Sequence, residues 1–136
     1  MIRFIVILFI ISSCNSKYQN QYIDIVNQAD SIYIVYTSGV YKDTTIELST
    51  ELKKDFKSVF EGKDEKCSCA STGRIRFYSK NDIILVADFS IDKVNNINGE
   101  DCVFLSVFPS DHGCYRLNYN TGMFLSETYA DLKRSK

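Results

Sequence analysis

The sequence has few of the features from which enzymes build their active sites. It contains no tryptophan, one proline and a single histidine, His112. Its six glycines are scattered singly at turn positions, so they form no glycine-rich phosphate loop. The Gly-x-Ser-x-Gly turn that presents a serine nucleophile is absent as well. Because a lone histidine in a polar turn (109–113) is normally a surface residue, we do not expect the protein to be an enzyme.

A surplus of basic residues is also missing. The chain carries 16 lysines and arginines against 17 aspartates and glutamates, a formal net charge of −1. A protein that binds nucleic acid needs cations to neutralise phosphates, so nucleic acid is not an expected partner. The neighbouring carboxylates at 64–65 and 100–101 lie in polar segments and are predicted to be solvated rather than to form an acid–base pair.

The N-terminal apolar run is too short to cross a membrane. It extends from Phe4 to Ile11, eight residues that follow Arg3. As a helix it would be about 12 Å long, against about 30 Å for the hydrocarbon core of a bilayer. Two serines then separate it from Cys14. This order of cation, apolar run, small pair and cysteine resembles the signal of bacterial lipoproteins.

The resemblance to bacterial lipoproteins implies where the protein works. Residues 1–13 would be a signal peptide, and lipid, including palmitate, would be attached to the thiol and the new amine of Cys14. Residues 14–20 would then be the lipidated cysteine with a short tether, and 21–136 a single globular domain. Because no aspartate follows the cysteine, the resemblance favours the periplasmic side of the outer membrane within the cell envelope. A plain signal peptide that happens to end at a cysteine is the alternative.

The rest of the chain has the composition of a sheet-rich domain. Isoleucine, valine, tyrosine and phenylalanine are plentiful, and such residues favour strands. The patterns predict seven strands, at 32–37, 44–48, 74–78, 83–90, 102–108, 114–119 and 123–126. They predict two helices, at 18–29 and 50–61. The expected fold class is therefore α+β, an antiparallel meander of about seven strands with one or two helices packed on one face.

The helix at 50–61 has the clearest signals. Ser49 can cap its first turn, and Gly62 is expected to end it in the left-handed conformation. One apolar stripe runs along it, formed by Leu52, Phe56, Val59 and Phe60. At the other end of the domain, the sequence Asn120-Thr121-Gly122 predicts a hairpin turn before the strand at 123–126.

Four cysteines remain after Cys14, namely Cys67, Cys69, Cys102 and Cys114. An even number outside the cytoplasm favours structural disulfides. A bridge between the first two would close a small strained ring, so each is expected to pair with one of the last two. Two such bridges, with the residue between Cys67 and Cys69, span about 18 Å. If Cys114 lies beside Phe108 across the turn, Cys102 is six strand residues back from Phe108 and about 20 Å away. One disulfide is therefore expected, and a second is left open.

A soft-metal site is the competing interpretation of these cysteines. Three thiolates with the imidazole of His112 could bind copper(I) or zinc. Structural zinc sites favour two or more residues between paired cysteines, and Cys67 and Cys69 have one between them. We therefore expect no metal or other cofactor, and a thiol or copper(I) carrier is an alternative function.

The expected function is that of a protein-binding module in the cell envelope. Lipid-anchored inhibitors of cell-wall hydrolases and immunity proteins against envelope toxins resemble this chain in their build of signal, tether and small domain. An inhibitor or immunity role is therefore a further alternative. The candidate residues for contact with a partner are Arg74, Arg76 and Tyr78 on one strand and His112 in the turn at 109–113. An ordinary solvated strand without a binding role is the alternative for the first three, and the pattern favours it. The partner and the oligomeric state are left open.

Overall fold

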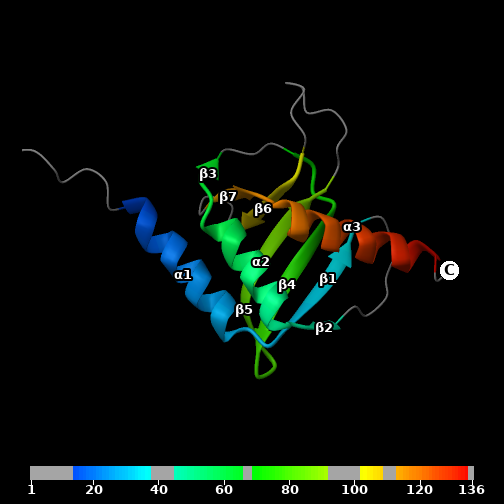
Figure 1. The fold of residues 1–136 in the computed structure, drawn as a ribbon, viewed down its shortest axis with the longest axis horizontal. Helices are drawn as coiled ribbons and strands as arrows, with labels where there is room; N and C mark the ends of the chain where they lie inside the picture. Colours follow the sequence, from blue (N-terminus) through cyan, green and yellow to red (C-terminus); the bar gives the residue numbers. More distant parts are fainter. Residues whose placement is uncertain (1–13, 38–44, 66–68, 92–101, 109–112, 135–136) are drawn as a thin grey trace, which may run out of the picture.

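A seven-stranded antiparallel sheet with three helices against one of its faces makes up the part of the chain that the structure describes (Figure 1). This computed structural model describes residues 14–37, 45–65, 69–91, 102–108 and 113–134, with the backbone alone at 14–20 and 132. The elements are α1 (Cys14–Gln28), β1 (Ser31–Tyr36), β2 (Thr45–Glu47), α2 (Thr50–Phe60), β3 (Asp64–Glu65), β4 (Gly73–Ser79), β5 (Asp82–Ser90), β6 (Phe104–Val107), β7 (Cys114–Arg116) and α3 (Tyr119–Arg134). The expected α+β class is confirmed.

The strands lie in the order β2-β1-β4-β5-β6-β7-β3, and every neighbouring pair is antiparallel. Strands β4 to β7 form the expected meander. β1 joins it by pairing with β4, and the chain between these two strands includes β2, α2 and β3. The two edge strands are short, with three residues in β2 and two in β3, which limits pairing with the strands of another molecule.

The register of the central strands separates the two faces of the sheet. Ile75 and Phe77 of β4 lie opposite Ile34 and Ile32 of β1, and all four are fully buried under the helices. Successive side chains of a strand point to opposite faces. The intervening residues of β4 therefore point away from the helices, as the alternation in the sequence predicts.

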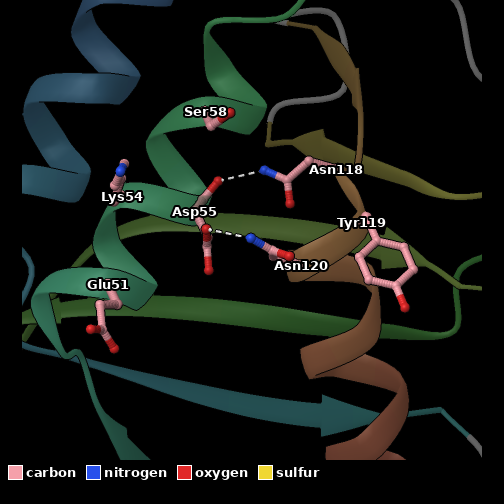
Figure 2. Close-up of a pocket in the computed structure, with 7 residues that line it drawn as sticks. All are labelled: Glu51, Lys54, Asp55, Ser58, Asn118, Tyr119 and Asn120. Atoms are coloured by element: carbon pink, nitrogen blue, oxygen red, sulfur yellow. Dashed lines mark hydrogen bonds between the residues drawn. The ribbon is translucent and has the colours of Figure 1, made fainter.

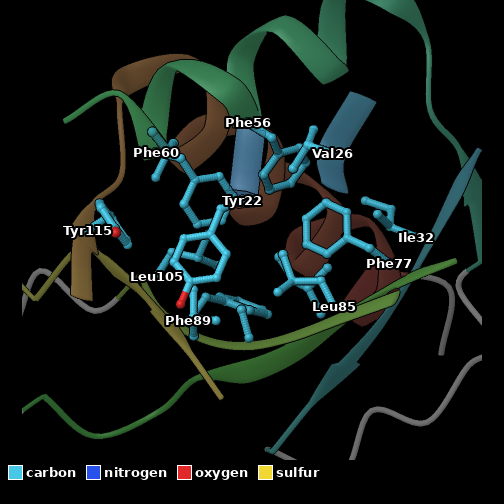
Figure 3. Close-up of a cluster of buried hydrophobic side chains, with 14 of the residues drawn as sticks. Tyr22, Val26, Ile32, Phe56, Phe60, Phe77, Leu85, Phe89, Leu105 and Tyr115 are labelled. Carbon is cyan, nitrogen blue, oxygen red and sulfur yellow. The ribbon is translucent and has the colours of Figure 1, made fainter. Parts of the chain in front are cut away.

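The helices are held to the sheet by interlocking aromatic rings (Figure 3). On α2, Phe56 meets Phe77 edge to face, and Phe60 meets Tyr115 in the same way, each with ring centroids 5.2 Å apart. Tyr22 of α1 packs against Phe60 at 5.3 Å. Such tilted and edge-to-face pairs add to the free energy gained from burying the rings. The apolar stripes predicted for the first two helices therefore form the core.

The third helix is fixed to the first strand by a buried hydrogen bond. The hydroxyl of Tyr36 donates to the backbone oxygen of Leu125 at 2.9 Å. Burial raises the pKa of Tyr36, which keeps this phenol protonated as a donor. Burial also raises the pKa of Tyr115, to about 12. Both phenols thus remain neutral parts of the core at physiological pH.

The strand and hairpin predicted at the C-terminal end are wrong, because residues 119–134 form α3. Asn118 begins this helix, since its side-chain oxygen accepts a hydrogen bond from the backbone N–H of Thr121 at 2.8 Å. The same Asn-rich sequence therefore caps a helix instead of turning a hairpin. The described sheet still has seven strands because β3, which was not predicted, pairs with β7.

Two further predictions near helix ends are corrected. Gly62 does not have the positive φ that was predicted. Helix α2 ends instead with Glu61 as its C-cap, in a right-handed conformation (φ −73°, ψ −15°). The N–H groups of Glu61 and Gly62 reach the carbonyls of Lys57 and Val59, and this tight turn replaces a glycine stop. At the N-terminal side, α1 begins at Cys14 and not at residue 18 as predicted, so the segment assigned to the tether is part of this helix.

Replacing Phe56 by alanine should lower the free energy of unfolding by about 3–5 kcal/mol, because the ring is fully buried between α2 and β4. Urea denaturation followed by circular dichroism would measure the loss. Phe108→Ala is the matched control, since this phenylalanine is 45% exposed and its loss should cost about 1 kcal/mol or less. Equal losses for the two variants would contradict the layer arrangement.

Candidate functional site

No described element covers the face of the sheet that points away from the helices. All three helices contribute to the same buried cluster on the opposite face. We define the outer face by the side chains on the uncovered side of the central strands, namely Tyr33, Val35, Arg74, Arg76, Tyr78, Val86, Asp88, Phe104, Ser106, Phe108 and Arg116. Three of the four residues predicted to contact a partner, Arg74, Arg76 and Tyr78, thus lie together here and are half-buried. His112 lies outside the described residues.

Arg74 is held in a fixed position near the centre of the outer face. Its Nε donates to Oδ1 of Asp88 at 2.7 Å, and the two residues lie directly opposite each other on β4 and β5. Its guanidinium carbon lies 4.6 Å from the centre of the Phe108 ring. Because the side chains of Arg74 and Asp88 are 43% and 25% exposed, the ion pair adds little to stability. Its clearer effect is to orient the guanidinium group.

Arg76 lies one row further along β4, between Tyr33 and Val86 on the neighbouring strands. Within the described ranges its side chain has no ion pair and no hydrogen bond. Its charge is thus available to another molecule. A guanidinium group offers five donors in a planar fork, which suits a carboxylate.

The charges of this surface are arranged with cations at the centre and anions at the edges. The outer face has one acidic residue, Asp88, and three arginines, namely Arg74, Arg76 and Arg116. Arg116 lies over the ring of Phe104, with its guanidinium carbon 5.0 Å from the ring centre, and this ring is itself buried. Glu47 and Glu65 occupy the same side of the edge strands β2 and β3. Aromatic residues and arginines at the centre, with charged residues around them, are typical of surfaces that bind proteins.

The cysteines join the strand ends at one side of the sheet. Cys69 and Cys102 form a disulfide with their Cα atoms 5.7 Å apart, which confirms the expected cross-link. It connects the segment before β4 to the segment before β6, and β5 lies between these strands. Cys114 is disulfide-bonded too, whereas Cys67 lies outside the described residues. The three described sulfurs are therefore not thiolates in this state. No cluster of three or more metal-binding side chains lies within the described ranges.

A second feature is a polar hollow between α2 and the start of α3, which we call the α2–α3 groove (Figure 2). Its volume is about 530 Å³, and it is lined by Glu51, Lys54, Asp55, Ser58, Asn118, Tyr119 and Asn120. Asn118 donates to the backbone oxygen of Asp55 at 2.8 Å, and Asn120 donates to its carboxylate at 3.2 Å. This groove was not predicted from the sequence, because residues 120–122 were expected to form a hairpin. The cap formed by Asn118 was the signal that could have revealed it.

The chain matches no protein-family model, no curated protein and no solved structure. None of the described helices is both long enough and apolar enough to cross a membrane.

Changing Cys69 and Cys102 together to serine should lower the free energy of unfolding by about 2–5 kcal/mol, the usual loss for a native disulfide. Both are changed so that no free thiol can exchange with the bridge at Cys114. Urea denaturation of the oxidised proteins would measure the difference. An unchanged midpoint would show that the bridge does not constrain the strand ends, and reduction of the variant would then report the contribution of Cys114 separately.

Proposed function

We propose that the protein is a lipid-anchored module of the cell envelope that binds another envelope protein through its outer face. The observation that carries this proposal is the uncovered sheet face, with its three arginines and its aromatic rings, opposite a face packed with helices. Aromatic residues and arginine are enriched, and lysine and glutamate are depleted, where proteins bind one another. An inhibitor of a cell-wall hydrolase, or an immunity protein against an envelope toxin, would be a specific form of this function.

The arrangement of the arginines indicates what the partner should offer. Arg74 is already oriented by Asp88 and Phe108, so binding would cost little further side-chain entropy. Arg76 brings a charge that no described residue neutralises. A carboxylate presented at the centre of the partner's surface would complement both. The binding should therefore weaken as salt is added, because exposed charges are screened.

The proposed site of the lipid anchor is Cys14. It is the first residue of α1, and Tyr22, on the same helix, is buried in the core. Eight helical residues extend about 12 Å, so lipid on Cys14 would hold the domain close to the membrane surface. Because the acyl chains and not a spanning helix would supply the attachment, this part of the proposal depends on one side chain.

Cys14→Ser should release the protein from membranes or leave the precursor uncut, because the serine cannot carry the thioether-linked lipid. Fractionation of cells into membrane and soluble parts, with mass spectrometry of the N-terminus, would measure both effects. Ser13→Ala is the control, since it keeps a small residue before the cysteine and should leave processing unchanged. A Cys14→Ser protein that stays in the membrane with a correctly cut N-terminus would refute lipid anchoring.

Arg76→Glu should weaken binding of the partner by about tenfold or more, because it places a second negative charge where a carboxylate is expected. The tagged full-length protein would be cross-linked in the bacterium, and the cross-linked proteins compared between variants. Arg134→Glu is the matched control, since it makes the same charge change at an exposed site on α3. A partner retained by Arg76→Glu and lost by Arg134→Glu would place the interface on the helical side instead.

A further inference from the structure

We propose that the α2–α3 groove binds an uncharged oligosaccharide, with one sugar ring stacked on Tyr119. This binding site is separate from the outer face, so the proposal stands or falls independently of the protein-binding function. It rests on an exposed aromatic ring, on polar groups with unused hydrogen-bonding capacity, and on the charge and size of the groove.

Tyr119 provides the aromatic surface. It is 79% exposed, more than any other large apolar side chain in the described ranges, and it lies at the edge of the groove (Figure 2). One exposed aromatic residue needs no functional explanation. Here, however, the ring adjoins a polar hollow at the first residue of α3, where the helix holds the backbone in place. An exposed ring beside hydrogen-bonding groups suits a sugar, which has an apolar C–H face and a rim of hydroxyl groups.

Hydrogen bonds fix the positions of polar groups in the groove, and only part of the hydrogen-bonding capacity of these groups is used within the described residues. Asn120 donates one hydrogen bond to Oδ1 of Asp55. Within the described residues, the second oxygen of that carboxylate and the side-chain oxygen of Asn120 accept no hydrogen bond, and the hydroxyl of Ser58 has no partner. The groove therefore offers donors and acceptors side by side. A sugar hydroxyl donates one hydrogen bond and accepts others, so it can use both kinds of group at once.

The charge of the groove argues against an anionic ligand. Glu51 and Asp55 outnumber the single cation, Lys54, so a phosphate or carboxylate would be repelled despite the nearby N-terminus of α3. A strongly basic ligand would be attracted by the two carboxylates but repelled by Lys54. An uncharged ligand avoids both conflicts.

The size and openness of the groove favour a chain of sugars over a single enclosed molecule. Its volume of about 530 Å³ lies within the range of small-molecule sites. Five of its lining residues, namely Glu51, Lys54, Ser58, Tyr119 and Asn120, are exposed. A ligand could therefore enter and leave the groove at its ends, as a segment of a longer polysaccharide would do.

The test is saturation-transfer NMR on the protein as purified from its own cells, in a phosphocholine detergent, because a maltoside detergent would itself present sugar to the groove. The probes are chitotriose, which carries acetamido groups, and cellotriose, which does not. We expect transfer to at least one of them at about 10 mM, the range suited to a shallow site. Transfer to chitotriose alone would identify an N-acetylated sugar as the preferred class, and transfer to both would identify the sugar ring as the shared determinant.

Variants then locate the binding. Tyr119→Ala should reduce affinity about tenfold, whereas Tyr119→Phe, which keeps the ring, should stay within about twofold of the wild type. Asn120→Ala gives a second measurement and should weaken binding about fivefold through loss of a hydrogen bond. Met123→Ala is the matched control, since Met123 is 39% exposed one turn further along α3 and does not line the groove. No transfer to either probe, or unchanged affinity in Tyr119→Ala, would overturn the proposal.

Discussion

The packing of Phe56 and Phe60 against the sheet is the constraint on which the rest of the structure depends. These two rings interlock with Phe77, Tyr115 and Tyr22, so α1, α2 and the strands β4 and β7 meet in one cluster. Because α3 adds Leu125 to the same cluster, all three helices lie on one side of a single sheet. The described part of the chain contains no fourth helix that could pack on the other side of the sheet. The exposure of the outer face is thus a direct result of where the helices are buried.

The parts of the fold that the sequence predicts are those governed by local patterns. Helix α2 carries its cap, its apolar stripe and its polar side within one segment, and strand β4 carries its alternation in the same way. Helix α3 was missed because a local hairpin signal competes there with long-range contacts that favour the helix. Asn120 and Gly122 suit a hairpin, and the contacts that favour the helix, from Asn118 and Asn120 to Asp55, come from residues more than 60 positions away. Strand β3 has only two residues and forms through its pairing with β7, so no local sequence pattern predicts it.

The same distinction applies to the candidate sites. Alternation along β4 was enough to predict that Arg74, Arg76 and Tyr78 share a face. The orientation of Arg74 could not be predicted, because it depends on Asp88 of β5 and on Phe108, which the sheet alone brings together. For the cysteines, the sequence restricted the possible pairings without choosing among them, and the strand order selected Cys69 with Cys102. The α2–α3 groove is wholly a product of tertiary contacts and had no counterpart in the sequence analysis.

The bond between Tyr36 and Leu125 has a consequence for the timing of folding. The two residues are 89 positions apart, and the hydroxyl of Tyr36 has its acceptor only after the last helix has been synthesised and has docked. Until then, the hydroxyl of Tyr36 can bond only to water, and the buried cluster lacks Leu125. Contacts between such distant residues slow folding, because a long loop must close before they form. The inner side of β1 is therefore completed last, by a helix from the far end of the chain.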